Sequence, residues 1–199
     1  MTAWTLVLPL KRLAIAKSRL RAEVAGADRV ALAFATDTLD AVAAARHVGR
    51  IVVVTADDAL TAAATERGAE VVPDTASGLD AAIALGLAGR PAPLAVLLGD
   101  LPALRAADLD DALTLALAQP RAMVPDDAGT GTTLLAATDG APVPRFGEGS
   151  RARHEAAGHT VLEAAPTLRR DVDTAGDLAE ALRLGVGAAT AAAVAELAL

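Results

Sequence analysis

An aspartate in the middle of the chain follows an apolar run. The run begins at Pro93 and predicts a buried strand that ends at Asp100, after which come Leu101 and Pro102. In open α/β sheets the carboxyl ends of the strands border the ligand crevice, so a carboxylate there can hold a divalent metal on the phosphates of a nucleotide. A plain cap on the helix that follows is an equally good interpretation of Asp100 taken alone.

Cations gather just after the first predicted strand, residues 4–8. Lys11, Arg12, Lys17 and Arg19 lie in this loop, where positive charge can cradle a triphosphate and neutralise a leaving pyrophosphate. The loop has neither a G-x-x-x-x-G-K-[ST] nor a G-x-G-x-x-G motif, which excludes a P-loop and a dinucleotide fingerprint. We predict nucleotide binding by Lys11, Arg12 and Lys17, and catalytic roles for Lys17 and Asp100. The alternative is a solvated basic turn.

Two further carboxylates lie near the C-terminal end of the sequence. A strand predicted near 168–172 places Asp171 and Asp173 on one face, because side chains alternate along a strand. Either carboxylate can join Asp100 on a metal ion. Asp177 follows Thr174 at the spacing of a capping box, which predicts a structural role for Asp177.

Two polar loops offer groups that can bind an anion. Residues 129–133 are Gly and Thr only, so backbone N–H groups and hydroxyls can close around a phosphate or carboxylate; an ordinary hairpin turn is the alternative. Ser150 opens a predicted helix, where free N–H groups favour an anion, although a plain Ser N-cap is the default. His154 lies one turn later and faces either the same anion or the surface. No G-x-S-x-G motif is present, which argues against a Ser–His hydrolase.

Composition excludes several classes of function. The 199 residues carry a formal charge of −7, with two Phe, one Trp and no Tyr, which argues against a nucleic-acid partner. The lack of Cys excludes disulfides, thiolate catalysis and cysteine-ligated metals. No targeting segment or apolar run of membrane-spanning length is visible. We therefore expect a soluble, cytoplasmic protein without a membrane partner.

The segments between these motifs alternate between strand and helix patterns. Further strands are predicted at 51–55, 70–72, 122–124 and 134–137, and helices at 28–45, 57–67, 79–87, 106–118, 150–157, 174–184 and 188–199. Such alternation predicts an α/β fold with a mostly parallel sheet and right-handed crossovers. No linker is evident, so we expect one domain over 1–199, with a core of about 4–187 and a C-terminal helix over 188–199.

The motifs together resemble those of one family. In chain order they are Pro-Leu-Lys at 9–11, Ala-Lys-Ser-Arg-Leu at 16–20, Gly-Leu at 78–79, Gly-Asp-Leu-Pro at 99–102, Gly-Thr-Gly-Thr at 129–132, Phe-Gly-x-x-Ser at 146–150 with His154, and Asp-Val-Asp-Thr at 171–174. This set resembles the 2-phospholactate guanylyltransferase family of coenzyme F420 biosynthesis, including its phosphoenolpyruvate-using actinobacterial branch. The resemblance runs from about residue 4 to residue 187.

The resemblance implies a fold and an activity. The fold is a nucleotidyltransferase fold of the glycosyltransferase-A-like, Rossmann-like kind, a three-layer α/β/α sandwich. The activity is transfer of GMP from GTP to the phosphate of a three-carbon phospho-acid, with release of pyrophosphate, and the product passes to the next enzyme of the pathway. Phosphoenolpyruvate, 2-phospholactate and 3-phosphoglycerate all stay open as the acceptor, and so does assembly into a homo-oligomer.

The resemblance also implies roles for individual residues. Mg²⁺ is the implied cofactor, and the implied functional residues are Asp100, Asp171 and Asp173 for the metal, Thr132, Gly147 and Ser150 for the phospho-acid, and Gly78 for the nucleotide. Two positions depart from the family pattern, since Gly99 stands where alanine is expected and Asp80 where asparagine is usual. Asp80 is expected near the base pocket and bears on guanine selectivity.

The implied chemistry agrees with the residue types. An anionic phosphate oxygen attacks phosphorus without a general base, so positioning and charge neutralisation suffice. Three alternatives stay open at this point. They are a sugar-phosphate or molybdopterin-type nucleotidyltransferase of the same fold, a glycosyltransferase, and a non-catalytic nucleotide-binding protein.

Overall fold

Strands from both halves of the chain form one mixed sheet. The computed structural model describes residues 3–24 and 26–197, and within them seven strands follow the order β3-β2-β1-β4-β6-β5-β7. Their bounds are β1 (Trp4–Pro9), β2 (Val48–Thr55), β3 (Glu70–Pro73), β4 (Leu94–Leu97), β5 (Arg121–Pro125), β6 (Thr132–Ala137) and β7 (Thr160–Val161). β6 runs antiparallel to β4 and β5, and the other neighbouring pairs are parallel. The prediction of a mostly parallel sheet is confirmed.

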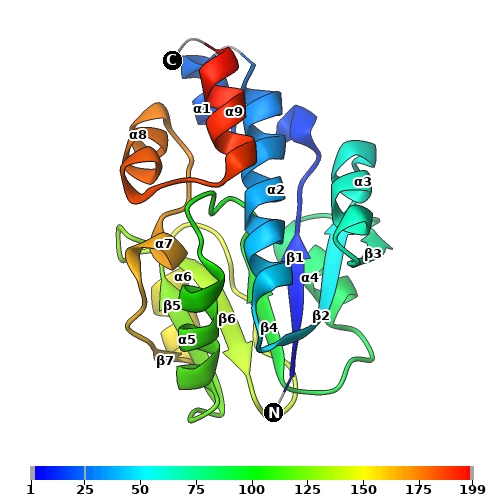
Figure 1. The fold of residues 1–199 in the computed structure, drawn as a ribbon. Coiled ribbons are helices and arrows are strands. Elements are labelled where there is room, and N and C mark those ends of the chain that lie inside the picture. The colour runs from blue at the N-terminus through cyan, green and yellow to red at the C-terminus, as the bar shows by residue number, and fades with distance from the viewer. Residues whose placement is uncertain (1–2, 25, 198–199) are drawn as a thin grey trace.

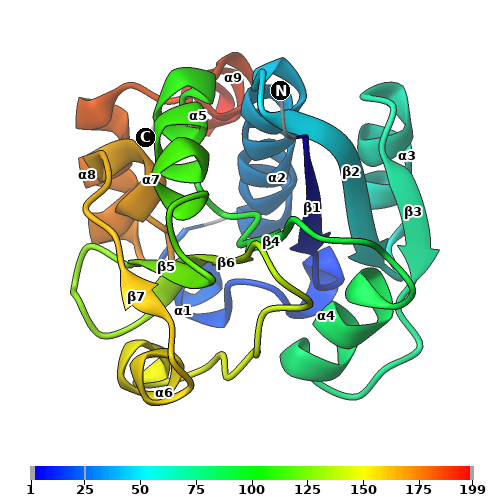
Figure 2. The ribbon, with the colours of Figure 1, turned by 90° about the horizontal axis from the view of Figure 1, so that it is seen from below.

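Helices cover both faces of this sheet (Figure 1). One face carries α2 (Ala27–Ala44), α3 (Asp58–Glu66) and α5 (Ala106–Ala116), and the other carries α4 (Leu79–Leu87) and α6 (Ser150–Ala156), as Figure 2 shows. Alternation along β1 explains the arrangement, because Leu6 and Leu8 join the buried cluster of α2 and α5, whereas Val7 packs with Ile83 of α4. The predicted three-layer α/β/α sandwich is confirmed.

A second buried cluster joins the C-terminal helices to α2. Phe34 of α2 packs there with residues of α1 (Ser18–Glu23), α8 (Ala175–Leu184) and α9 (Ala188–Glu196). The buried carboxylate of Asp37, also on α2, accepts hydrogen bonds from the N–H groups of Ala189 and Thr190 at 3.0 and 2.8 Å. α9 therefore lies against α2 (Figure 1). In the described part of the chain, no helix is both long enough and apolar enough to cross a membrane.

The strand predicted near 168–172 is wrong. That region holds a short helix, α7 (Pro166–Arg169), followed by irregular chain up to α8, and the last strand, β7, comes earlier. Pro166 suits the first turn of a helix, because its φ is fixed near the helical value and its missing N–H is not needed there. Short apolar segments do not distinguish strand from helix by periodicity, and Leu168 and Val172 are buried here without forming a strand.

The strand before Asp100 is shorter than predicted. β4 ends at Leu97, and the N–H of Leu98 makes one more bond to the sheet, to Thr133 O at 3.0 Å. The N–H of Leu101 then turns away to the buried hydroxyl of Thr38 on α2, at 3.1 Å. Asp100 therefore lies on a turn that is held at one end by the sheet and at the other by α2.

Candidate active site

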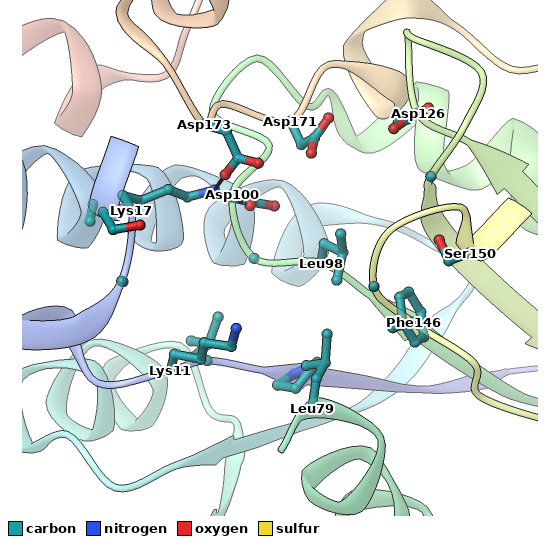
Figure 3. A pocket seen from close by; sticks show the side chains of 18 of the residues that line it. Lys11, Lys17, Leu79, Leu98, Asp100, Asp126, Phe146, Ser150, Asp171 and Asp173 are labelled. Atoms are coloured by element: carbon teal, nitrogen blue, oxygen red, sulfur yellow. Dashed lines mark hydrogen bonds and ion pairs between the residues drawn. The ribbon is translucent and has the colours of Figure 1, made fainter. Parts of the chain in front are cut away.

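A cavity of about 700 Å³ opens at the carboxyl ends of β1 and β4 (Figure 3). Its wall includes the loop after β1, the turn with Asp100, the loops that precede β6 and α6, and the chain between α7 and α8. The charged residues on this wall are the cations Lys11, Lys17 and Arg19 and the carboxylates Asp100, Asp126, Glu148, Asp171 and Asp173. The cavity thus combines anion-binding and cation-binding groups.

Lys17 lies between two of these carboxylates. Its Nζ donates to Asp173 Oδ1 at 2.6 Å and to Asp100 Oδ2, and its side chain is only 11% exposed (Figure 3). Burial by itself would lower the pKa of Lys17, but the charges of Asp100 and Asp173 together raise it above its ordinary value. Lys17 is therefore a fixed positive charge inside the cavity at neutral pH.

Asp171 and Asp173 reach Asp100 through a backbone hydrogen bond rather than through a strand. The N–H of Val172 donates to Asp100 O at 3.1 Å, and the Val172 side chain is fully buried. Since Val172 turns into the core, the carboxylates on both sides of it line the cavity (Figure 3). The predicted strand is absent here, yet the three carboxylates face one cavity.

These carboxylates are crowded and short of positive charge. Burial, and then the nearby charges of Asp100 and Asp173, raise the pKa of Asp171 to about 7. Asp100 Oδ1 is buried and has no hydrogen-bond partner among residues 3–24 and 26–197. Both features fit a site for a cation with oxygen ligands. Over the same residues no group of three or more His, Asp or Glu side chains is already arranged around one metal position, and Lys17 Nζ bridges Asp100 and Asp173 instead.

Hydroxyl groups line another part of the cavity. Thr132 begins β6 and Ser150 begins α6, both side chains are buried, and their Oγ atoms lie 3.4 Å apart. Gly149 is the N-cap of α6, so the Ser150 hydroxyl is not a helix cap. Gly147 has a φ of +109°, a conformation that favours glycine, and it lies on the cavity wall. The three residues predicted to hold the phospho-acid therefore share one wall.

Side chains behind this wall hold the loop that contains Phe146 and Gly147. Arg153 donates from Nε to Arg145 O and from Nη2 to Phe146 O, both at 3.1 Å. Asp80 of α4 accepts the N–H of Phe146 at 3.0 Å and does not belong to the cavity wall. Asp80 thus lies directly behind the cavity wall, and its expected place near a base pocket stays a prediction.

His154 neither lines the cavity nor reaches the surface. Its side chain is fully buried on α6, Nδ1 lies 2.9 Å from Thr132 Oγ1, and Nε2 accepts the N–H of Arg145 at 2.8 Å. Burial, and then the charge of His159, lower the pKa of His154 to about 4. His154 is therefore neutral at pH 7. Both orientations considered from the sequence differ from the one observed.

The residues predicted to bind the nucleotide separate into two groups. Lys11 and Lys17 lie on the cavity wall, and Arg12 and Gly78 do not. Arg12 is an exposed residue just before a 3-10 turn, and Gly78 is the N-cap of α4 with a φ of +99°. Leu79, next to Gly78, is the residue from this turn that reaches the cavity.

Asp126 is a cavity carboxylate for which the sequence suggested no role. Its Oδ1 accepts the N–H of Thr130 at 2.8 Å, and a Cβ at position 131 would collide with its carboxylate, so Gly131 is required for this turn. The charge of Asp126 also contributes to the raised pKa of Asp171. The Asp, Gly and Thr residues of 126–133 are typical of a loop with side-chain-to-backbone turns, and this composition is the signal that could have indicated it.

Comparison with solved structures identifies the fold. A nucleotidyl transferase from Methanothermobacter superposes with a TM-score of 0.59 at 16% identity, with 92% of this chain and 99% of that chain covered. A Mycobacterium tuberculosis protein, Rv0371c, in complex with manganese gives a TM-score of 0.54 at 18% identity, with the same coverage. At this identity the likeness shows the fold alone.

Sequence comparison identifies the family. The family described as "Guanylyl transferase CofC like" matches residues 4–198. A phosphoenolpyruvate guanylyltransferase from Salinispora arenicola is 50% identical, with 94% of this chain and 92% of the relative covered. One from Streptomyces scabiei is 49% identical, with 98% and 97% covered. The chain belongs to the CofC-like guanylyltransferase family, and the resemblance found in its motifs is confirmed.

Proposed function

We propose that this chain transfers GMP from GTP to the phosphate of phosphoenolpyruvate and releases pyrophosphate, in coenzyme F420 biosynthesis. The observation that carries the proposal is one cavity in which the Lys17, Asp100 and Asp173 cluster and the hydroxyls of Thr132 and Ser150 face the same space. The names of the relatives at about half identity support phosphoenolpyruvate as the acceptor. The chain would act as one catalytic domain, because a single sheet positions all parts of this cavity.

The reaction is an in-line displacement at the α-phosphorus of GTP. A phosphate oxygen of the acceptor forms the new P–O bond, and the bond between the α-phosphorus and the bridging oxygen to the β-phosphate breaks, so that pyrophosphate leaves. Lys17 stabilises the charge on the leaving group, and Lys11 binds the triphosphate from the same loop. No residue has to remove a proton from the acceptor, since its phosphate is already anionic.

We assign the divalent cation to Asp100 together with Asp171 or Asp173. The unpartnered Asp100 Oδ1 and the crowded Asp171 carboxylate support this assignment. Mg²⁺ would neutralise phosphate charge and polarise the α-phosphate in the bound nucleotide. The carboxylates hold their positions through the Val172 contact with Asp100, which does not depend on a bound ion.

Thr132, Gly147 and Ser150 would hold the phospho-acid. Two hydroxyls and the backbone at a glycine with positive φ can surround a carboxylate or phosphate without adding charge. The glycine matters because a side chain at 147 would approach Arg153, whose Nη2 would lie 3.3 Å from the added Cβ. The acceptor is therefore expected to be recognised mainly by neutral donors.

Pyrophosphate release tests this proposal. Purified protein is mixed with GTP, Mg²⁺ and one of phosphoenolpyruvate, 2-phospholactate and 3-phosphoglycerate, and each mixture is repeated with ATP and CTP in place of GTP. We expect release with GTP and phosphoenolpyruvate, and little with the other pairs. The next enzyme of the pathway is added in a parallel set, so that an unstable product does not hide turnover. GTP binding without pyrophosphate release from any acceptor would contradict the proposal and indicate a nucleotide-binding protein.

A further inference from the structure

We infer that His154 is a positioning residue that keeps the Thr132 hydroxyl directed as a hydrogen-bond donor towards the acceptor. The inference rests on the proposed function, because the acceptor wall is assigned there. His154 itself is outside that wall, and its ring contacts Thr132, the N–H of Arg145 and the Phe146 ring, which belong to the acceptor wall or to the loop that forms it.

The hydrogen bonds of the ring fix its tautomer. Nε2 lies 2.8 Å from the backbone nitrogen of Arg145, and a backbone N–H can only donate, so Nε2 must carry a lone pair. In a neutral imidazole the single proton is then on Nδ1. Nδ1 lies 2.9 Å from Thr132 Oγ1 and therefore donates to that oxygen.

The donation from His154 Nδ1 determines which hydrogen bonds the hydroxyls of Thr132 and Ser150 can make. Thr132 Oγ1 accepts from His154, so its own hydrogen cannot point at the ring. Ser150 Oγ is the only other side-chain partner of Thr132 Oγ1 in the described residues, at 3.4 Å, and a single hydrogen can lie between these two oxygens. Ser150 Oγ donates to Thr132 Oγ1, so Thr132 Oγ1 accepts both bonds and its own hydrogen is left to donate to a group in the cavity. In the opposite tautomer Nδ1 would accept a hydrogen bond from the Thr132 hydroxyl. Thr132 and Ser150 would then have one hydrogen fewer to donate into the cavity.

The surroundings of the ring keep it neutral. The ring is fully buried, and the charged or titratable groups that act on it are His159 after α6, Asp80 of α4, Arg153 of α6 and Arg145 of the loop. Asp80 alone among these four favours the protonated ring, while the other three oppose it. Phe146 and His159 pack edge-on against the ring, with centroids 4.9 and 5.7 Å away. The ring is therefore held in place from several elements.

The ring also links the parts of the acceptor wall to one another. Thr132 comes from β6, Ser150 from α6, and Arg145 leads directly into Phe146 and Gly147. Loss of the ring would free the Thr132 hydroxyl to rotate and would release the N–H of Arg145. Both changes weaken acceptor binding, and neither touches the Lys17 end of the cavity.

Two substitutions test the contributions of the two ring nitrogens separately. In His154→Asn the side-chain Nδ2 occupies roughly the place of the ring Nδ1 and can still donate to Thr132. In His154→Gln the amide reaches the place of Nε2, so it can serve Arg145 but not Thr132. We expect the KM for phosphoenolpyruvate to rise about tenfold in His154→Gln, the effect of one lost hydrogen bond, and by less than about threefold in His154→Asn. The KM for GTP is expected to stay unchanged in both.

A histidine away from the cavity provides the matched control. His47 lies outside the cavity wall and its Nε2 is 3.3 Å from the hydroxyl of Thr114, so His47→Gln should leave the KM for phosphoenolpyruvate unchanged. Thr132→Val combined with His154→Gln should raise KM no further than Thr132→Val alone, because His154 acts through that hydroxyl. Circular dichroism and urea unfolding check that each variant is folded.

The tautomer is also measured directly, without turnover. Long-range ¹H–¹⁵N correlation spectra of the wild-type protein at pH 7 should show the His154 proton on Nδ1, and a proton on Nε2 would overturn the inference. Equal acceptor KM values in wild type, His154→Gln and His154→Asn would also overturn it. If the wild type itself releases no pyrophosphate, the proposed function fails and the assignment to the acceptor fails with it, whatever the tautomer.

Discussion

Lys17 holds a backbone conformation that a lysine rarely adopts. Its φ of +53° and ψ of +47° lie in the left-handed region, which costs roughly 1 kcal/mol for a residue with a side chain. The ion pairs with Asp100 and Asp173 offset this cost and aim the ammonium into the cavity. Strain of this kind is common where a side chain must be presented to a ligand, and here it coincides with the proposed leaving-group site.

Asp100 gives the sharpest prediction for a single residue. Asp100→Asn removes the charge that faces Lys17 and the proposed cation, while the backbone contacts to Val172 and Thr38 stay in place. We predict that kcat for pyrophosphate release falls by at least about a hundredfold with an unchanged circular dichroism spectrum.

A surface aspartate provides the control for this substitution. Asp28 forms an exposed ion pair with Arg21 outside the cavity wall, so Asp28→Asn should retain kcat within about twofold. Near-normal turnover in Asp100→Asn would refute the assignment of Asp100 to the divalent cation.

On the scale of elements, the neutral imidazole of His154 connects α6 to β6. Its neutrality makes the free energy of unfolding depend on pH. The pKa of His154 is about 4 in the folded protein, against 6.5 for an ordinary histidine. Between these values the unfolded chain binds more protons, so the free energy of unfolding falls as pH decreases from 6.5 towards 4 and is fully retained above 6.5. The total loss is of order 3 kcal/mol.

Urea unfolding at pH 7.5, 6, 5 and 4.5 measures this dependence. The wild type is compared with His154→Gln at each pH, because the raised pKa of Asp171 adds a slope of opposite sign that both proteins share. We predict that wild type loses more stability than His154→Gln as the pH falls. Parallel curves for the two proteins would show that the ring is not held neutral.

One buried carboxylate contributes to the attachment of α9 to α2. Asp37 accepts the N–H groups of Ala189 and Thr190, so Asp37→Ala would leave both donors without a partner. We predict a loss of about 2 kcal/mol in the free energy of unfolding, measured with urea. Asp40 also lies on α2, and its exposed carboxylate pairs with Arg67. Asp40→Ala should lower the free energy of unfolding by less than about 1 kcal/mol. Equal losses would contradict a special role for Asp37.

Long, periodic elements could be predicted from the sequence, and the reasons are local. The helix led by Gly78 and the helix capped by Asp57 have the predicted starts, because N-cap and turn residues act on their own neighbours. The capping box of Thr174 and Asp177 is also present as predicted. Contacts between distant segments carry no such signal, so the chain around Val172 was predicted as a strand although a bond to Asp100 shapes it.

The candidate site shows the same division. The residue types of the cavity could be recognised in the sequence, since Asp100 ends a predicted strand and Lys17 and Thr132 stand in loops beside predicted strands. Hydrogen bonds between distant residues could not be predicted. The bond from the N–H of Phe146 to Asp80 and the bond between Thr132 and His154 form only when α4, β6 and α6 pack together. Tertiary contacts therefore decide which polar residues line the cavity and which hold it in shape.

On the scale of the whole molecule, an acidic protein has to bind two anionic substrates. The formal charge of the chain is −7, and its cavity wall holds more carboxylates than cations. Free GTP would therefore be repelled, whereas GTP that arrives with a divalent cation brings the charge that the carboxylates need. This balance is the reason to expect metal-dependent nucleotide binding.

The fate of the α-phosphate of GTP tests the central claim most directly. Protein, Mg²⁺ and phosphoenolpyruvate are incubated in parallel with GTP labelled with ³²P at the α-position or at the γ-position, and the products are separated. We predict that the α-label enters a new compound only when phosphoenolpyruvate is present and that the γ-label appears in pyrophosphate. α-Label recovered only as GTP, with no γ-label in pyrophosphate, would contradict the account of this chain as a guanylyltransferase acting on phosphoenolpyruvate.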